Sequence, residues 1–295
     1  MEDALRHLRE GTPIAFATET VYGLGAPVFN EAALRKIFTI KGRPSDNPLI
    51  VHVADWEMVE RVAQEVPEVA RLLGGRYWPG PLTLVLKRRP EVPALVSAGL
   101  ETVAVRMPRH PVARELIRRL GEPIAAPSAN LSGRPSPTTA AHVWEDLEGR
   151  VPLVLDGGPC EVGIESTVVG LVGVPTLLRP GSIGREELEA VLGCRLAEPQ
   201  GPAQAPGMKY RHYAPRAEVV VVRTREALAA HAGAYLIEAP DERTLYGQFR
   251  EADRRGAGKV VVFAHEGLSE ALLNRIGKAA SRRAVECAGD PVACS

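Results

Sequence analysis

The chain has 295 residues, of which 45% are hydrophobic, and its 36 basic residues balance 36 acidic ones. This length favours two domains, each with enough apolar residues for a core of its own. Zero net charge argues against binding nucleic acid through a broad basic surface, although local basic pockets remain compatible with it. The charged start, MEDALRHLRE, lacks the apolar stretch of a signal peptide, and no apolar run is long enough to span a bilayer. We therefore expect a cytoplasmic protein.

Hydrophobic periodicity predicts an α/β domain over residues 1–197. Helices are predicted at 2–9, 31–40, 56–73 with an interruption near Pro67, 111–120 and 186–192. Strands are predicted at 13–17, 49–53, 82–87, 102–106, 124–126, 153–155, 166–170 and 176–179. The four cysteines, Cys160, Cys194, Cys287 and Cys294, form no CxxC pair, which argues against structural zinc and favours reduced thiols.

The character of the sequence changes after this domain. Residues 198–216 contain four prolines and no apolar periodicity, which predicts an extended linker. Over residues 217–295, strands at 217–222, 234–238 and 259–264 alternate with helices at 224–232, 242–255 and 266–283, which predicts a small Rossmann-like domain with a parallel sheet. The turn after its first strand has no glycine, so the dinucleotide-binding fingerprint is absent there.

The segment KGRPSDNPLIVH, residues 41–52, joins a dense polar loop to an apolar strand. An isolated Lys-x-Arg in a surface loop is most often merely solvated. Here Lys41 and Arg43 lie between turn-forming residues and a buried strand, which favours the rim of a pocket. Lysine would supply a mobile charge there, and arginine a planar fork for phosphate oxygens. His52 taken alone is more often a packed core histidine than a ligand contact.

Other polar groups occur where predicted strands end. In TETVYGLG, residues 18–25, Gly23 and Gly25 indicate either a turn with positive φ or close approach of the backbone to a ligand, with Thr20 and Tyr22 offering hydroxyls. Arg106 ends a buried strand and requires a partner, which is either an internal carboxylate or the carboxylate of a ligand.

Three further loops repeat this pattern: IAAPSANLSGRPSPT at 124–138, GIESTVVG at 163–170 and LLRPGSIG at 177–184. Each alone is compatible with a simple turn, but five such loops in one domain describe a concave polar site. The sequence contains no GxxxxGK[ST] loop, HExxH motif, GxSxG elbow or paired-carboxylate metal motif.

Six segments, taken in order, resemble the YrdC-like family of threonylcarbamoyl-AMP synthases: TETVYGLG, KGRPSDNPLIVH, YWPGPLTLVL, PSANLSG, ESTVV and LRPG. The linker sequence PGMKYRHYAP, followed by a small α/β domain, resembles the longer, two-domain members. The resemblance implies a twisted mixed sheet around a deep basic cavity. It departs from the family at Ala17, where a proline is usual, and in a shortened C-terminal domain with an unfamiliar tail.

The resemblance also implies a reaction, in which L-threonine, bicarbonate and ATP give threonylcarbamoyl-AMP and pyrophosphate. A separate enzyme complex would transfer the threonylcarbamoyl group to tRNAs that decode ANN codons. The family's catalytic residues map onto Lys41, Arg43, Ser128 and Asn130. Its ATP contacts map onto Arg43, Asn47, Thr102, Ser128, Ser136, Arg179 and Tyr213, and its threonine contacts onto Thr20, His52, Arg106, Ala126 and Ser166.

The implied chemistry needs no covalent nucleophile, because positioning and charge neutralisation suffice for attack of a carbamate on the α-phosphate. Mg²⁺ is expected on the ATP phosphates, without a dedicated protein site, and the linker is expected to act as a lid carrying Tyr213. Two other interpretations stay open. An RNA-binding module is disfavoured by zero net charge and 5% aromatic residues. A carbamoyl-phosphate-using maturation enzyme would carry acylphosphatase and zinc-finger segments, which this chain lacks.

Overall fold

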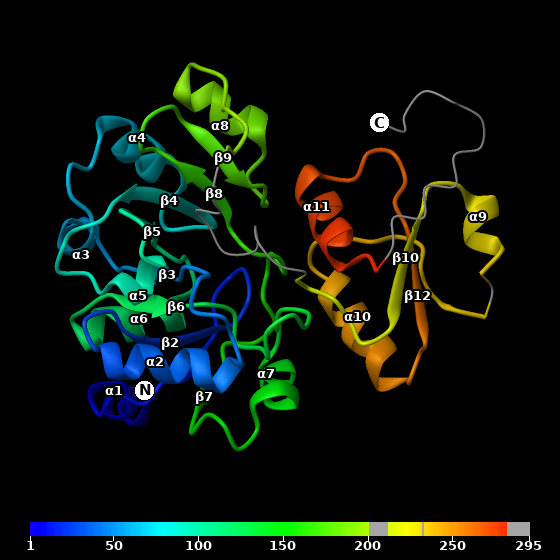
Figure 1. Ribbon diagram of the computed structural model, residues 1–295, viewed down its shortest axis with the longest axis horizontal. Helices are drawn as coiled ribbons and strands as arrows, with labels where there is room; N and C mark the ends of the chain where they lie inside the picture. The colour runs from blue at the N-terminus through cyan, green and yellow to red at the C-terminus, as the bar shows by residue number, and fades with distance from the viewer. Residues whose placement is uncertain (201–211, 232, 282–295) are drawn as a thin grey trace.

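Two β-sheets divide the protein into a larger and a smaller domain (Figure 1). The computed structural model describes residues 1–200, 212–231 and 233–281. The helices are α1 (Glu2–Arg9), α2 (Glu31–Lys41), α3 (Trp56–Val62), α4 (Glu68–Tyr77), α5 (Ala94–Ser97), α6 (Pro111–Leu120), α7 (Ala140–Leu147), α8 (Arg185–Leu192), α9 (Arg225–Ala229), α10 (Leu245–Arg254) and α11 (Glu270–Ala279). The strands are β1 (Ile14–Phe16), β2 (Gly23–Pro27), β3 (Ile50–His52), β4 (Leu82–Lys87), β5 (Thr102–Arg106), β6 (Ile124–Ala126), β7 (Val154–Leu155), β8 (Thr167–Gly170), β9 (Thr176–Arg179), β10 (Glu218–Val222), β11 (Tyr235–Ile237) and β12 (Lys259–Phe263).

The larger sheet has the strand order β7-β1-β2-β6-β3-β5-β4-β8-β9. It is mixed, as predicted, because β3 runs parallel to β5 whereas β4 runs antiparallel to β5. The register places His52 of β3 opposite Arg106 of β5, and Arg106 opposite Thr83 of β4. Three polar side chains thereby meet at one level of an otherwise apolar sheet.

The two faces of the larger sheet differ. One face packs on helices α1 to α8 in a single hydrophobic cluster, to which Leu8, Leu34 and Leu116 belong. The other face carries a small apolar cluster made of Ile50, Val85, Ala104, Val168 and Leu178. Because side chains alternate along a strand, Arg106 shares this second face with Ala104. The polar residues at the strand ends therefore lie on the face away from the main core.

The turn after α2 positions the cationic loop. The side chain of Asn30 caps the start of the helix by accepting a hydrogen bond from the amide of Ala33 at 3.0 Å. Gly42 ends the helix in the left-handed conformation with φ of 59°, which a residue without a Cβ adopts at little cost. Lys41 is thus the last helical residue, one position beyond the predicted end of the helix, and Arg43 begins the loop.

The smaller domain has a parallel sheet of order β10-β12-β11, which confirms the predicted Rossmann-like order of elements. Helices α10 and α11 lie on the side of this sheet that faces the larger domain, and α9 lies on its outer side (Figure 1). The apolar cluster of this domain includes Val21 and Ile164, so the two domains share a hydrophobic contact. Among the described residues, no helix is long and apolar enough to cross a membrane.

Several elements differ from the predictions. The interruption predicted near Pro67 is confirmed, because α3 and α4 are separate helices and Pro67 precedes α4, but α4 continues to Tyr77, beyond the predicted end at residue 73. Helices α5 and α7 were not predicted. Of the predicted linker, residues 201–211 lie outside the described residues, as does the end of the helix predicted over 266–283. The described parts of the linker, 198–200 and 212–216, contain no helix or strand.

The glycines of TETVYGLG lie in strand β2 and not in a turn with positive φ, so that alternative was wrong. Packing explains them: a Cβ on Gly25 would lie 2.6 Å from both Ile124 and Phe16. Gly23 contacts the Phe16 ring and also lines the cavity described below, and close approach of a ligand to its backbone stays a prediction.

Candidate active site

A cavity of about 60 Å³ opens on the sheet face that carries Ile50. Its walls come from the ends of strands β3, β5, β6 and β9, from the loops before β2 and β8, and from His212 and Tyr213 of the linker. Three arginines line it: Arg43, Arg106 and Arg179. Small-molecule sites usually measure several hundred Å³, so this arrangement is too tight for two substrates at once.

All five residues predicted to contact threonine line this cavity, namely Thr20, His52, Arg106, Ala126 and Ser166. The structure therefore brings together residues that are 146 positions apart in the chain, at the ends of neighbouring strands and in the loops beside them. Their contact with a ligand stays a prediction.

Arg106 is anchored on three sides. Its Nε donates to the carbonyl oxygen of Gly80 at 3.2 Å, Nη1 donates to Oγ1 of Thr20 at 2.7 Å, and Nη2 lies 2.7 Å from Oε1 of Glu19. Burial alone would raise the pKa of Glu19, but the ion pair with Arg106 outweighs burial and holds this pKa below its ordinary value. Glu19 is thus the internal partner that the sequence left open, and Arg106 faces the cavity from a fixed position.

His52 lies beside this pair. Burial, reinforced by the nearby charge of Arg106, lowers the pKa of His52 to about 3, so the imidazole is neutral at neutral pH. Its Nδ1 lies 3.1 Å from the carbonyl oxygen of Ile50 and donates to it. A neutral, oriented ring in this position adds no further charge to the site.

Ser166 belongs to a second hydrogen-bonded group of the site, next to Thr83, which lies opposite Arg106 in the sheet. Its hydroxyl lies 2.7 Å from Oγ1 of Thr83, and it accepts from Nη2 of Arg179 at 3.1 Å. Nε and Nη2 of Arg179 also donate to the carbonyl oxygen of Ser166, at 3.1 and 3.0 Å. Burial lowers the pKa of Arg179. These bonds fix the guanidinium of Arg179 against the loop before β8.

The residues predicted to contact ATP fall into two groups. Arg43, Ser128, Arg179 and Tyr213 line the cavity. The other predicted ATP contacts and two predicted catalytic residues do not line the cavity, and lie behind its wall or along the sheet. They are Asn47, Thr102 and Ser136, and Lys41 and Asn130.

Lys41 holds the loop that follows β6. Its Nζ donates to the carbonyl oxygen of Ser128 at 2.5 Å and to that of Asn130, and lies 3.5 Å from Oδ1 of Asn130. Burial lowers the pKa of Lys41 well below its ordinary value. Three of the four predicted catalytic residues are therefore in mutual contact, with the ammonium group directed at backbone oxygens.

Arg43 is the predicted catalytic residue with free donor capacity. Its Nη2 donates to the carbonyl oxygens of Asn47 and Pro48 at 3.3 and 3.0 Å, which orients the side chain. Its buried Nε has no hydrogen-bond partner among the described residues. Burial lowers the pKa of Arg43 to about 10, so the guanidinium remains charged at neutral pH. An unpaired buried donor on a charged group is a ready contact for an anion.

Thr102 lies farther along the sheet. It starts β5, whereas Arg106 ends this strand, and both project from the same face as Ala104 because they are an even number of residues apart. The apolar cluster of Ile50, Val85 and Ala104 thus extends from the cavity towards Thr102. This strip is apolar, and its members are buried.

The linker reaches the cavity through Tyr213. This residue has φ of 67°, which is uncommon outside glycine and marks a backbone held by its surroundings. Its ring stacks on Tyr246 of α10 at a centroid distance of 5.5 Å. Its neighbour His212 lies 3.5 Å from Nδ2 of Asn47. The linker is therefore held by both domains.

Glu165 was missed as a site residue, although it begins the quoted segment ESTVV. It is the only carboxylate among the described residues that line the cavity. Its oxygens accept from Ser136 Oγ at 2.5 Å, from Tyr246 OH at 2.9 Å and from Arg275 Nε at 2.8 Å. No pattern in the small domain marked Arg275 or Tyr246, because each lies on the apolar face of an ordinary helix.

The described residues contain no group of three or more His, Cys, Asp or Glu side chains placed to hold a metal ion. Both oxygens of Glu165 are already engaged by donors, so this carboxylate does not fit a metal in the present arrangement.

A mixed-sheet domain with a cationic cavity, joined by a linker to a small parallel domain, defines the architectural class of the two-domain YrdC-like proteins. Residues 6–181 match the Sua5_yciO_yrdC family model, described as telomere recombination, and residues 183–243 match the Sua5_C model, described as the C-terminal domain of threonylcarbamoyl-AMP synthase. The chain belongs to this family.

Individual relatives agree with this assignment. The threonylcarbamoyl-AMP synthase of Pyrococcus abyssi is 45% identical over 95% of this chain and 93% of its own length. That of Bacillus subtilis is 43% identical over 94% of this chain and 92% of its own length. The crystal structure of P. abyssi Sua5 complexed with L-threonine superposes with a TM-score of 0.87 at 43% identity, and covers 94% of this chain and 93% of that chain.

Proposed function

We propose that this chain is an L-threonylcarbamoyladenylate synthase, a nucleotidyltransferase that acts on L-threonine, bicarbonate and ATP. The observation that carries the proposal is the set of three arginines, Arg43, Arg106 and Arg179, around one cavity at the strand ends. An amino-acid carboxylate and a triphosphate are the anionic groups such a cavity is suited to hold. The names of the full-length relatives, and the threonine complex of one of them, support the same activity.

Threonine is proposed to bind at the Arg106 end. Nη1 and Nη2 of Arg106 face its carboxylate, with Glu19 and Thr20 holding the guanidinium in position. The neutral imidazole of His52 and the hydroxyl of Ser166 would contact the side chain or the amine of threonine. The small volume of the cavity and the hydroxyls of Thr20 and Ser166 in its lining would favour a small hydroxylated amino acid.

ATP is proposed to lie across the sheet with its phosphates at Arg43 and Arg179. The unpaired Nε of Arg43 would contact a phosphate oxygen, and the purine would cover the apolar cluster of Ile50 and Ala104 towards Thr102. Lys41 holds the backbone of Ser128 and Asn130, which keeps the loop after β6 in reach of the phosphates. Mg²⁺ would neutralise the phosphates while bound mainly to them, since the cavity offers no unengaged carboxylate among the described residues.

The reaction balances as threonine plus bicarbonate plus ATP giving threonylcarbamoyl-AMP, pyrophosphate and water. The threonine amine and bicarbonate form a carbamate with loss of water, and a carbamate oxygen then attacks the α-phosphate as the pyrophosphate oxygen leaves. The residues that line the cavity supply orientation and positive charge for this step. Since the cavity measures only about 60 Å³, movement of Tyr213 would make room for ATP, and its return would exclude water.

We further propose that the product passes to a tRNA-modifying transferase complex, and that the protein works in the cytoplasm, where ATP and tRNA meet. The test of the activity is pyrophosphate release from ATP with each substrate omitted in turn. Release that requires both threonine and bicarbonate is the expected result. Release that is indifferent to threonine would refute the assignment, and a salt-sensitive affinity for tRNA without threonine would favour an RNA-binding role instead.

A further inference from the structure

Helix α11 of the small domain places Arg275 against the wall of the cavity. Its side chain is fully buried, its Nε donates to Oε2 of Glu165 at 2.8 Å, and its Nη1 donates to the carbonyl oxygen of Pro180 at 2.9 Å. Its guanidinium carbon lies 5.5 Å from the centre of the Tyr213 ring. One side chain of the small domain therefore joins three segments of the site: the loop before β8, the turn after β9 and the linker.

Glu165 extends this contact to Ser136. Its Oε1 accepts from Ser136 Oγ at 2.5 Å, while Oε2 accepts from Arg275 and from Tyr246 OH at 2.9 Å. Burial alone would raise the pKa of Glu165, but Arg275 and Arg179 outweigh burial and keep this pKa below its ordinary value. The carboxylate is therefore charged and held in one orientation, and it can hold the serine hydroxyl in turn.

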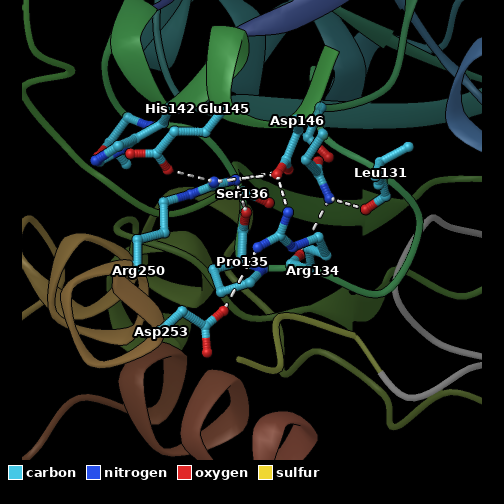
Figure 2. Close-up of polar contacts among 12 residues, drawn as sticks. Leu131, Arg134, Pro135, Ser136, His142, Glu145, Asp146, Arg250 and Asp253 are labelled. Atoms are coloured by element: carbon cyan, nitrogen blue, oxygen red, sulfur yellow. Dashed lines mark hydrogen bonds and ion pairs between the residues drawn. The ribbon is translucent and has the colours of Figure 1, made fainter. Parts of the chain in front are cut away.

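A second arginine of the small domain holds the neighbouring residue. Figure 2 shows Arg250 of α10 reaching towards Asp146 and Glu145 of α7, close to Pro135. Its Nη2 donates to the carbonyl oxygen of Pro135 at 2.6 Å and to Oδ2 of Asp146 at 2.9 Å. The backbone before Ser136 and the side chain of Ser136 are thus both fixed from the small domain.

Stability alone does not account for this arrangement. A buried ion pair adds little net stability compared with apolar packing of the same volume, because both charges lose their hydration. Apolar contacts already join the domains, since Val21 and Ile164 belong to the hydrophobic cluster of the small domain. Within that interface, the polar contacts of Arg275 and Tyr246 converge on the one carboxylate that both lines the cavity and holds Ser136.

We propose that Arg275, supported by Tyr246, is a positioning residue for the reaction: by holding Glu165 it fixes Ser136, a predicted ATP contact that lies behind the wall of the cavity. This inference rests on the proposed function and assigns the small domain a part in it. Arg275 itself does not line the cavity and acts through Glu165. Loss of Arg275 is therefore expected to weaken ATP binding selectively and to leave threonine binding nearly unchanged.

The test compares Arg275→Gln, Tyr246→Phe and the matched control Arg255→Gln in the full chain. Arg255 lies at the exposed end of α10 and pairs with Glu251 on the surface. Circular dichroism establishes that each variant is folded at the assay temperature. For Arg275→Gln we expect the KM for ATP to rise at least about tenfold, with the KM for threonine within about twofold of wild type. Tyr246→Phe removes one donor to Glu165 and keeps the ring, so a smaller rise in the same constant is expected.

The double variant Arg275→Gln/Ser136→Ala tests the route through Glu165. If Arg275 acts by holding Ser136, the double variant raises the KM for ATP hardly more than the larger single change. Equal rises in both KM values, fully additive losses, or no change in the KM for ATP would each overturn the proposal. ATP binding measured by calorimetry without threonine gives a reading that does not depend on turnover. Failure of the wild-type protein to release pyrophosphate would instead refute the proposed function.

Discussion

The carboxylate of Glu19 and the guanidinium of Arg106 form an ion pair of 2.7 Å in which both side chains are almost fully buried. Each comes from a segment that also supplies a wall of the cavity, since Thr20 follows Glu19 and accepts from Arg106 at 2.7 Å. Arg106 is therefore charged, paired and directed before any ligand arrives. A ligand carboxylate at this point would share a guanidinium that is already oriented, which reduces the entropy lost on binding.

Replacement of Arg106 by lysine should mainly affect threonine. Lysine keeps the charge but loses the planar fork that contacts Thr20 and Glu19 at once. We expect the KM for threonine to rise about 100-fold, equivalent to about 3 kcal/mol, with a much smaller change for ATP. Initial rates of pyrophosphate release with each substrate varied would measure this. Arg109→Lys is the control. Arg109 lies just after β5 and forms an exposed ion pair with Glu161.

Acid should weaken the protein partly through Glu19. Its pKa is lower in the folded than in the unfolded protein, so its contribution to stability is present above the unfolded pKa and is lost as pH falls through the folded pKa. At pH 7, Glu19→Gln should reduce the free energy of unfolding by about 3–5 kcal/mol, because Arg106 is left buried without a counter-charge. Below about pH 4 the unfolded carboxyl of Glu19 takes up a proton, so the difference from wild type should begin to shrink.

Urea unfolding at a series of pH values measures this difference. Glu161→Gln serves as the control, since the exposed Arg109 pair contributes little at any pH. A difference between Glu19→Gln and wild type that stays constant down to pH 3 would contradict the expected role of Glu19.

Local signals in the sequence account for much of the larger domain. The Asn30 cap and Gly42 mark the ends of α2 within one residue of prediction, and the apolar run that ends at Arg106 was predicted as a strand with the bounds of β5. Strand β2 was missed because its two glycines indicate a turn when read locally. They are required by Phe16 and Ile124, which approach from other strands and are not adjacent in the chain.

The same limit applies to the site. Residues within one sequence motif could be predicted together as site residues. All five residues predicted to contact threonine line one cavity. The partner of Arg106 could not be predicted from the sequence, because Glu19 lies 87 positions earlier in the chain. Both an internal carboxylate and a ligand carboxylate therefore remained possible. Arg275 and Tyr246 had no local signal at all, because their role arises only where two domains meet. Long-range packing of this kind leaves no periodicity to detect.

The ion-pair cluster in Figure 2 should couple the unfolding of the two domains. Arg250 is buried and lies 2.9 Å from Asp146 and 3.1 Å from Glu145, across the domain boundary. Arg250→Met should leave Asp146 with Arg134 alone and reduce stability by about 3 kcal/mol. Differential scanning calorimetry should then resolve two transitions where the wild type has one.

The control for that change is Arg254→Met on the same helix. Arg254 is half exposed and contacts Glu145 at 3.5 Å and Glu251 at 2.8 Å, so its loss should cost less than about 1 kcal/mol and keep a single transition. Two transitions in both variants would mean that any disturbance of α10 separates the domains, and would contradict a specific part for Arg250.

Two glycine-to-alanine changes should have opposite effects. A Cβ at Gly25 would lie 2.6 Å from Phe16 and Ile124 in the packed core, so Gly25→Ala should destabilise by about 1–3 kcal/mol. Gly75 lies within α4 and a Cβ there would meet nothing within 4 Å, so Gly75→Ala should stabilise by up to about 1 kcal/mol through helix propensity. Thermal melts of both variants measure the signs.

Activity separates the two positions further. Gly25 shares β2 with Gly23, which lines the cavity, so any shift of β2 that accommodates the new methyl group should also raise the KM for threonine. Gly75 is remote from the cavity, and Gly75→Ala should leave both KM values unchanged. If Gly25→Ala were as stable and as active as wild type, the glycines of TETVYGLG would not be required by packing. Their presence would then have to be explained by the approach of the ligand to Gly23 alone.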